Sequence, residues 1–283
     1  MCLGIARAIS ISEGREEFLR ELLDFARENK RDMPWRHVDA DDTIDPYVVL
    51  VSEIMLQQTQ VPRVLPKFQE FMEAFPSVER LAAATLPDVF AVWNGLGYNR
   101  RARYLLEAAQ QLAGKTFPKT LEQLTALKGI GHNTAAAILT YSFNQRQVFV
   151  ETNIRTVLLH HFFAGKTEPV HDGELRTLLE GLLLDQSPRE FYWAMMDYGT
   201  HLKKLGHTHG SKSKHHSKQS AFAGSVRQLR GELMRRGLRA ELVEVARREI
   251  ADDRFDSVVA QLESEGLLEV KRGRLSLPNQ KAQ

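Results

Sequence analysis

Two short stretches of the chain hold groups that could do chemistry, and the first surrounds a single acid. Glu53 is the only charged residue in a largely apolar run from Tyr47 to Leu56. A carboxyl group that loses its hydration among apolar side chains keeps its proton to a higher pH, so its pKa rises and it can act as an acid near neutral pH. Glu53 is therefore a candidate proton donor; the alternative is an ordinary glutamate on a helix surface.

The second stretch is a glycine turn that leads into a helix. Gly129 and Gly131 stand two apart at the entrance of an alanine-rich, apolar segment. Glycine can take up positive φ and bring the backbone close to a partner. Amide groups at a helix N-terminus carry partial positive charge, which suits a phosphate oxygen. The pattern predicts a phosphate-binding turn with Lys128 beside it; a plain tight turn between two helices is the alternative.

The elements that must position these groups are helices. Ser12 to Asn29 has the spacing of an amphipathic helix, and from Pro46 onward nearly every segment has helical spacing, with Pro or Gly at its ends. The sequence therefore predicts an all-α fold. The helices expected after the first are 47–58, 64–75, 78–84, 86–93, 100–112, 121–127, 133–142, 152–163, 173–184 and 188–201.

Composition limits the class of protein. The chain has 283 residues, of which 43% are hydrophobic, so it can bury a core and hold two domains. Its net charge of +2 conceals basic runs at 100–103, 203–218 and 227–239, and such patches suit a polyanion. No apolar run reaches the roughly 18 residues of a membrane span, and no signal peptide is visible. We expect a soluble, intracellular protein without a membrane partner.

Cysteine and histidine usage argues against a metal site. Cys2 is the single cysteine, which excludes an internal disulfide and a cysteine-rich metal site. The segment 206–219 is rich in Lys, His, Ser and Gly and reads as a linker. Histidine tracts can ligate zinc, but no helical pairing with a carboxylate supports this here, so we favour a basic strap or a solvated linker. The histidines in or beside the linker are His201, His207, His209, His215 and His216.

The C-terminal segment has the outline of a winged helix-turn-helix. Three predicted helices, 227–236, 240–249 and 254–265, precede two β-like runs, 267–270 and 275–277, around a basic glycine turn. The third helix would read DNA, but its face is acidic. Contact with DNA through the wing and a packing or partner-binding role both stay open. The acidic residues are Asp252, Asp253, Asp256 and Glu263.

The turn and the acid-bearing helix resemble parts of one family. Residues 127–135 read Leu-Lys-Gly-Ile-Gly-His-Asn-Thr-Ala, which resembles the helix-hairpin-helix of the base-excision DNA glycosylase superfamily. Residues 45–61 look, nearly residue for residue, like the corresponding segment of MutY-type adenine DNA glycosylases. Further similar motifs, in the family's order, are Met-Pro-Trp-Arg at 33–36, Trp-Asn-Gly-Leu-Gly-Tyr at 93–98 with Arg-Ala-Arg at 101–103, and Met-Asp-Tyr-Gly at 196–199.

This resemblance implies a two-lobed helical fold and a surface for DNA. Residues 1–205 would form the glycosylase, with an inner six-helix lobe at 45–134 and a second lobe from 1–44 and 135–205. A linker at 206–221 and the winged-helix-like segment at 222–283 would follow. An enzyme that removes a base must extrude the nucleotide and fill the gap, for which amides and a flat ring are suited. The residues expected to touch DNA are Arg36, Gln57, Gln58, Tyr98, Arg101, Lys128, Gly129, Ile130, Gly131 and Thr134.

The resemblance also suggests a base pocket and the catalytic groups. Trp35, Leu56 and Asp197 would line the pocket, although Trp35 could instead be a buried residue that closes a helix end and Asp197 an acid on a helix surface. Breaking an N-glycosidic bond calls for an acid near the base and an anion near the sugar. Glu53 would be the acid. Glu151, where the family has aspartate, would be the anion with Asn153 nearby, and helix capping is the alternative for Glu151.

The resemblance also implies how the reaction ends and whether a cofactor is needed. Bifunctional members use a lysine after the hairpin to attack the sugar. Asn133 stands there, so we expect base removal without strand cleavage. Relatives also carry four cysteines after Asp-x-Gly that hold an iron–sulfur cluster, which needs thiolates. The residues that follow Gly199 here are Thr-His-Leu-Lys-Lys-Leu-Gly-His, so we expect no cluster.

Together these expectations describe a monofunctional DNA repair glycosylase. It would act as a monomer on double-stranded DNA in a bacterial or archaeal cytoplasm, at the nucleoid, and hydrolyse a mispaired adenine opposite 8-oxoguanine or G. The first alternative is a related glycosylase for T, U or hypoxanthine. The second is a catalytically impaired DNA-binding protein, in which the change from aspartate to Glu151 has silenced the chemistry.

Overall fold

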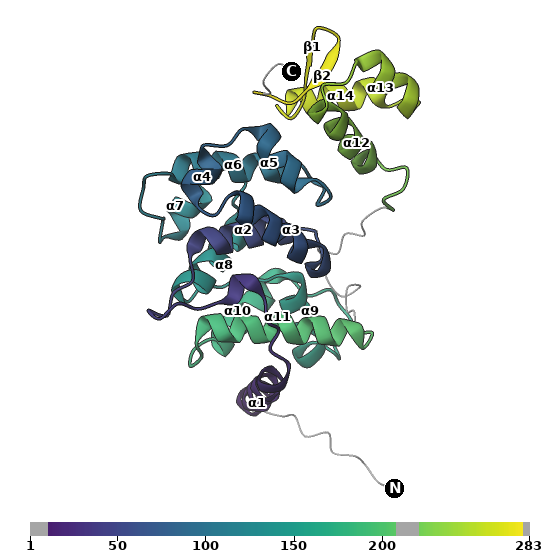
Figure 1. Ribbon diagram of the computed structural model, residues 1–283. Helices are drawn as coiled ribbons and strands as arrows, with labels where there is room; N and C mark the ends of the chain where they lie inside the picture. The colour runs from purple at the N-terminus through teal and green to yellow at the C-terminus, as the bar shows by residue number, and fades with distance from the viewer. Residues whose placement is uncertain (1–10, 208–220, 280–283) are drawn as a thin grey trace. The chain divides into compact units, whose positions relative to one another are not determined.

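The computed structural model describes residues 11–207 and 221–279 (Figure 1). Over these residues the chain forms fourteen α-helices, one 3₁₀ helix and two short strands. The expected all-α fold class is confirmed. None of the described helices combines the length and the apolar character needed to cross a bilayer.

The chain divides into two compact units, which are described separately. The first contains residues 1–44 and 135–217, and the second contains residues 45–134 and 218–283. The first unit holds α1 (Ile11–Asn29), η1 (Pro34–Arg36), most of α8 (His132–Phe143), α9 (Thr152–Phe162), α10 (Asp172–Leu182) and α11 (Pro188–Lys204). The second holds α2 (Pro46–Leu56), α3 (Val61–Ala74), α4 (Val78–Ala82), α5 (Leu86–Trp93), α6 (Arg100–Leu112), α7 (Leu121–Thr125), α12 (Val226–Leu238), α13 (Val243–Ile250), α14 (Phe255–Ser264), β1 (Glu269–Lys271) and β2 (Arg274–Ser276).

In the second unit, α2 is the central helix. The Asp45 side chain accepts a hydrogen bond from the Tyr47 amide at 2.8 Å, and Pro46 occupies the first turn, so the sequence sets the start of the helix. Residues on most sides of α2 are buried, and it packs against α3 and α6. The buried Tyr47 hydroxyl donates to the Phe75 carbonyl at 2.7 Å, and the buried Ser52 hydroxyl donates to the Val49 carbonyl at 2.9 Å, so both polar groups have partners.

In the first unit, α11 is the helix that organises the others. Both α9 and α1 pack against it (Figure 1). Its buried residues include Phe191, Tyr192 and Trp193, and the Tyr192 ring stacks on Phe149 at a centroid distance of 4.0 Å. Because α9 begins directly after Phe149 and Val150, this aromatic contact fixes the chain just ahead of Glu151.

The C-terminal segment forms three helices, α12 to α14, followed by an antiparallel hairpin in which Val270 pairs with Leu275. This is the order that the sequence predicts. The strands are displaced by one or two residues from the predicted runs, because Leu267 and Leu268 are buried ahead of β1. The assignment of this segment as a separate winged-helix-like domain, with the boundaries given above, stays a prediction.

Candidate functional site

Glu53 lies in α2, where it is the single charged side chain of the helix. Its neighbours in the chain, Ser52 and Ile54, are fully buried, and Glu53 itself is partly buried. The carboxyl group thus lies in a largely apolar helix and stays partly accessible. The role of Glu53 as the proton donor remains a prediction.

Arg101 holds the C-terminal end of α2 in place. Its Nη1 donates to the carbonyl oxygens of Ile54, Met55 and Gln57 at 2.7, 2.9 and 2.7 Å. Its Nη2 donates to Thr59 Oγ1 and to the carbonyl oxygens of Leu96 and Gly97 at 3.0, 3.2 and 3.1 Å. These bonds satisfy carbonyls that a helix end leaves without partners.

This placement corrects the expectation that Arg101 contacts DNA. The residue is 8% exposed, and burial lowers the pKa of its guanidinium to about 10. Both terminal nitrogens are engaged by the protein, so neither is directed at a phosphate. The physical role of Arg101 is to hold the backbone that carries Gln57 and Gln58.

Gln57 and Gln58 follow directly after this braced helix end. Gln57 Nε2 donates to Thr134 Oγ1 at 3.2 Å, which ties the end of α2 to the first turn of α8. Gln58 is exposed and has φ +55°. A residue other than glycine in the left-handed region is uncommon and marks local strain, which tends to occur at functional positions. The placement of Gln58 suits a side chain that enters DNA.

Tyr98 shares this feature with Gln58. It has φ +47°, follows Gly95 and Gly97 with φ +100° and +70°, and is partly buried. Arg101 lies 5.4 Å from its ring centroid, and Trp93 Nε1 donates to the Gly97 carbonyl at 3.2 Å. Of the amides and the ring that were expected to fill the gap in DNA, Gln58 and Tyr98 are thus held in left-handed backbone. Arg101 binds the turns that carry them.

The glycine turn behaves differently at its two glycines. Gly129 has φ +82°, and a Cβ there would lie 2.6 Å from Tyr104 Cβ, so only glycine fits. Gly131 does not have positive φ, and a Cβ there would meet nothing within 4 Å. The expectation of positive φ is therefore wrong for Gly131, and close approach of its backbone to a phosphate stays a prediction.

The other residues of the turn have separate surroundings. Ile130 is 4% exposed, so its side chain anchors the turn in the core and only its backbone could meet a phosphate. Lys128 is exposed, and its Nζ lies 3.4 Å from Glu107 Oε2. Asn133 lies in the first turn of α8 and is partly buried. No amine stands at position 133.

In the first unit, Glu151 occupies the N-cap position of α9, with φ −101° and ψ 170°. Its side chain makes no capping hydrogen bond, so capping does not explain the acid. Burial raises the pKa of the Glu151 carboxyl. Burial, and the nearby charge of Glu151, also raise the pKa of the Tyr192 hydroxyl. Asn153, in the first turn of α9, accepts a hydrogen bond from Lys203 Nζ at 2.6 Å.

Asp197 and Arg36 bind each other. Asp197 is 4% exposed; Arg36 Nη1 lies 2.9 Å from its Oδ2, and Arg31 Nε lies 2.5 Å from its Oδ1. The Arg36 guanidinium also lies 5.3 Å from the Trp193 ring centroid. Both carboxylate oxygens of Asp197 are engaged by arginines. The expectations that Asp197 faces a base and that Arg36 contacts DNA are therefore not supported by their placement, because the pair braces η1 against α11.

The remaining pocket residues lie on elements of the expected type. Trp35 is buried at 8% exposure in η1, and Leu56 is partly buried at the last position of α2. Buried packing at the 3₁₀ helix, which was the alternative for Trp35, describes its surroundings.

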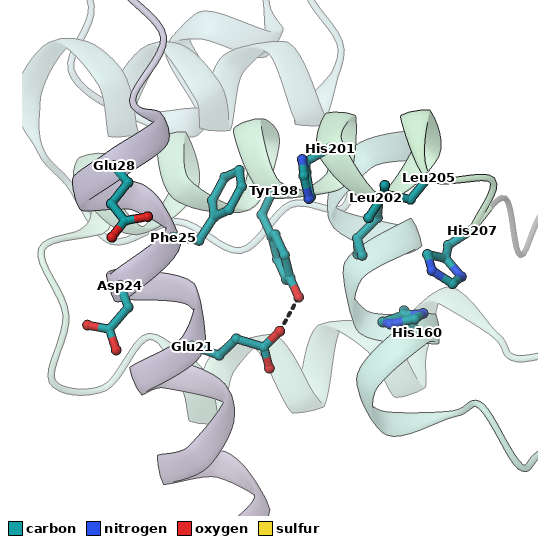
Figure 2. A pocket seen from close by; sticks show the side chains of 10 residues that line it. All are labelled: Glu21, Asp24, Phe25, Glu28, His160, Tyr198, His201, Leu202, Leu205 and His207. Carbon is teal, nitrogen blue, oxygen red and sulfur yellow. Dashed lines mark hydrogen bonds between the residues drawn. The ribbon is translucent and has the colours of Figure 1, made fainter.

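A pocket of about 530 Å³ lies elsewhere, on α1, α9 and α11 (Figure 2). The Tyr198 hydroxyl donates to Glu21, and His161 Nε2 lies 3.0 Å from the Tyr198 oxygen. Burial lowers the pKa of His161. The sequence analysis missed this pocket, because its only signal is the placement of acidic and aromatic residues along one amphipathic helix. Its lining residues are Glu21, Asp24, Phe25, Glu28, His160, Tyr198, His201, Leu202, Leu205 and His207.

The residues after Gly199 do not fit an iron–sulfur cluster. No side chain from Thr200 to His207 is a thiol. Within 11–207 and 221–279, no group of three or more His, Cys, Asp or Glu residues is arranged to hold a metal ion. Three of the histidines considered for zinc, His209, His215 and His216, lie outside the described residues.

In the C-terminal segment, arginines partly neutralise the acidic face. Asp256 pairs with Arg247, and Arg254 Nη2 lies 2.6 Å from Asp252 Oδ2. The hydrogen bonds from Arg254 lower the pKa of Asp252 to about 2. The acidic residues are thus present but two of them are paired with arginines. DNA contact through the wing and a packing or partner-binding role both stay predictions.

Known proteins are similar to most of the chain. Adenine DNA glycosylase of Mus musculus is 36% identical over 191 residues, which cover 64% of this chain and 37% of that protein. Adenine DNA glycosylase of Mycobacterium tuberculosis (strain H37Rv) is 34% identical over 183 residues, covering 63% and 59%. The chain thus spans between about a third and three fifths of the length of these curated relatives.

Solved structures agree on the fold. The structure of a thermostable thymine-DNA glycosylase has a TM-score of 0.59 at 27% identity and covers 66% of this chain and 87% of that one. Residues 51–182, which include Glu53, the glycine turn and Glu151, match the HhH-GPD superfamily base excision DNA repair proteins. The segment that carries Glu53, the glycine turn and Glu151 is therefore similar to the HhH-GPD superfamily of base excision DNA repair proteins.

Proposed function

We propose that the protein is a monofunctional DNA glycosylase that removes a mispaired adenine, opposite 8-oxoguanine or G, from double-stranded DNA. The observation that carries the proposal is Glu53, a partly buried carboxyl group that is the only charged side chain of α2. It lies within the segment 45–61 that resembles MutY-type enzymes, and curated relatives named adenine DNA glycosylase match over most of the chain.

The reaction assigns a separate task to each acid. The N-glycosidic bond breaks, its electron pair leaves with the base, and Glu53 donates a proton to a ring nitrogen of the departing adenine. The sugar becomes cationic, and the carboxylate of Glu151 stabilises it while a water molecule adds to C1′. The proton that this water releases passes to solvent, from which Glu53 is protonated again. The products are free adenine and an abasic site. Asn153, held beside Glu151 in the first turn of α9, orients this end of the site.

DNA binding is assigned to the turn and the two strained residues. The amides at Gly129 to Gly131 would receive a phosphate, and Lys128 adds a positive charge. Gln58 and Tyr98 would enter the space that the extruded nucleotide leaves. Phosphate contacts position the protein without reading sequence, so the turn contributes equally to all duplexes.

The proposal includes no strand cleavage and no iron–sulfur cluster. Asn133 has no amine that could attack C1′ to form a Schiff base. The chain has one cysteine, whereas the cluster needs four thiolates. We further propose that the protein acts as a monomer.

One observation favours a second substrate. The thermostable structure at 27% identity is that of a thymine-DNA glycosylase. Removal of thymine opposite G is therefore the second candidate activity. A catalytically impaired protein that binds DNA without excising a base is the third, since Glu151 is longer by one methylene than the aspartate of the family.

The test is a panel of labelled duplexes. These carry A opposite 8-oxoguanine, A opposite G, T opposite G, U opposite G, and hypoxanthine, and each is incubated with the protein and then treated with alkali. Strand breaks on the first two duplexes, only after alkali, support the proposal. Breaks on T opposite G alone select the second activity, and binding without breaks selects the third.

Glu53→Gln is the matched variant for the acid. It retains the size and hydrogen bonding of the side chain but cannot donate the proton, so product should fall below detection while duplex affinity is unchanged. Excision by this variant at the wild-type rate would overturn the assignment of Glu53.

A further inference from the structure

The contact between α9 and α11 is unusually close at Asn153. A Cβ placed on Gly199 would lie 2.5 Å from the Asn153 carbonyl oxygen and 2.8 Å from Asn153 Cβ. Contacts this short do not occur, so glycine at position 199 is required for α11 to approach the first turn of α9. The backbone of α11 thus forms one wall around Asn153.

Two further groups from the same face of α11 hold the Asn153 amide. Residue 203 follows residues 199 and 200 by about one helical turn, so its side chain lies on the same face as each of them. Asn153 Nδ2 donates to Thr200 Oγ1 at 3.4 Å, and Lys203 Nζ donates to Asn153 Oδ1 at 2.6 Å. Both ends of the amide therefore have partners on α11.

The chemistry of the partners determines which way the amide points. The Thr200 hydroxyl donates its hydrogen to the Met196 carbonyl at 2.9 Å, so its oxygen is left to accept from Nδ2. Lys203 can only donate, so it must face Oδ1. The donors and acceptors of Thr200 and Lys203 therefore allow only one orientation of the Asn153 amide, with Oδ1 toward Lys203 and Nδ2 toward Thr200.

Lys203 is not explained by an ion pair. It is partly buried, and burial, together with the charge of Arg155, lowers its pKa. Among the described residues no carboxylate lies within 4.0 Å of Lys203, whereas most lysines taken out of water are paired. The side-chain partner of Lys203 is instead Asn153, whose Oδ1 accepts a hydrogen bond from Nζ at 2.6 Å.

We propose that Lys203 is a positioning residue for base excision, which acts through the Asn153 amide to fix the first turn of α9 and hence Glu151. This inference rests on the proposed function. The Glu151 side chain does not cap the helix, and the Glu151 carbonyl accepts the hydrogen bond from the Arg155 amide at 2.8 Å. The position of the acid therefore depends on where the first turn is held, and a misplacement of about 1 Å can cost on the order of a hundredfold in rate.

The first experiment compares Lys203→Met with Lys204→Met in the full-length protein. Lys204 is exposed on the same last turn of α11 and serves as the matched control. Single-turnover excision at saturating enzyme should fall roughly 10- to 100-fold in Lys203→Met, with duplex affinity changed less than about twofold, and Lys204→Met should match the wild type. Excision by Lys203→Met at the wild-type rate would overturn the proposal.

A double-mutant cycle tests the route through Asn153. If Lys203 acts through the amide, Lys203→Met should cause no further loss in an Asn153→Ala background. Losses that multiply would show that Lys203 works independently and would contradict the proposal.

Chemical rescue separates a positioning amine from general damage to the fold. In a Cys2→Ser background, Lys203→Cys should lose excision and regain it after alkylation with 2-bromoethylamine, which restores an amine at nearly the original length. Alkylation that restores no activity to a folded variant would count against the inference.

A measurement that does not need activity distinguishes this inference from the proposed function. The side-chain amide resonances of ¹⁵N-labelled Asn153 should shift in Lys203→Met and stay unchanged in Lys204→Met. If the wild-type protein excises no base, the proposed function fails. Unchanged Asn153 resonances in Lys203→Met would by themselves refute the inference that Lys203 holds the Asn153 amide.

Discussion

Two buried charges, Arg101 in the second unit and Asp197 in the first, are held in opposite ways. Arg101 is surrounded by neutral oxygens, five of them backbone carbonyls. Asp197 is surrounded by the charged guanidinium groups of Arg31 and Arg36. The arginine therefore fixes backbone at the end of α2, whereas the aspartate joins side chains from segments far apart in the chain. Both were expected to face DNA or a base, and both instead bind other parts of the protein.

The largest expected loss of stability comes from replacing Arg101, whose guanidinium binds backbone carbonyls. Arg101→Leu removes a donor from five carbonyl oxygens. The Gly97 and Gln57 carbonyls keep a second donor, from Trp93 and Thr59. Each buried group that is left unsatisfied costs about 1–3 kcal/mol, so we expect a loss of about 5 kcal/mol in the free energy of unfolding. Urea unfolding measures this loss. Arg101→Lys, which keeps the charge and three donors, should lose less than half as much; equal losses would show that the planar guanidinium is not the important feature.

Removing the charge of Asp197 should cost somewhat less. Asp197→Asn leaves Arg31 and Arg36 facing each other without an anion, and breaking a buried pair in this way costs about 3 kcal/mol or more. Asp24→Asn is the control, because Asp24 pairs with Arg27 at an exposed site, where an ion pair contributes at most about 1 kcal/mol. Similar unfolding midpoints for the two variants would contradict the buried role of Asp197.

The two glycines of the turn at 129–131 should differ in their effect on stability. Gly129→Ala forces positive φ on alanine and a collision with Tyr104, so stability should fall by about 2 kcal/mol. Gly131→Ala meets open space and should change stability by no more than about 0.5 kcal/mol. Equal destabilisation in thermal unfolding would mean that the turn does not need glycine specifically at 129.

The smallest expected change in stability is at Glu151, and its sign depends on pH. Burial raises the pKa of this carboxyl, so the folded protein favours the protonated form and loses that preference as the pH rises through the raised pKa. Glu151→Gln should therefore be slightly more stable than the wild type at pH 8, within about 1 kcal/mol, and the gain should vanish on acidification.

The same variant should lose excision at every pH. Wild-type excision should decline as the pH falls through the raised pKa of Glu151, because the sugar cation needs the carboxylate form. Retained excision by Glu151→Gln would remove the acid from the mechanism.

The sequence predicted the parts of the molecule that depend on local pattern. Helical spacing identified the all-α fold, and the apolar run around Glu53 identified the largely buried helix α2 that carries it. The order of three helices and a hairpin at the C-terminus also followed from local spacing. Each of these signals extends over a few turns of chain.

Partners supplied from distant segments could not be predicted. Arg31 and Asp197 are 166 positions apart, and the carbonyls that occupy Arg101 come from two different turns. A motif shows that a residue type belongs at a position, but not whether the side chain faces a ligand or another part of the protein. The hydrogen bond from Lys203 to Asn153 also joins distant segments, so no local sequence pattern predicts it.

The left-handed backbone at Gln58 and Tyr98 bears on how this protein would respond to engineering. Glycine at either position relieves unfavourable φ, so a library sorted only by heat resistance should enrich such substitutions. Such variants would lack the side chains proposed to fill the gap in DNA. Selection for heat resistance alone would therefore reduce base excision.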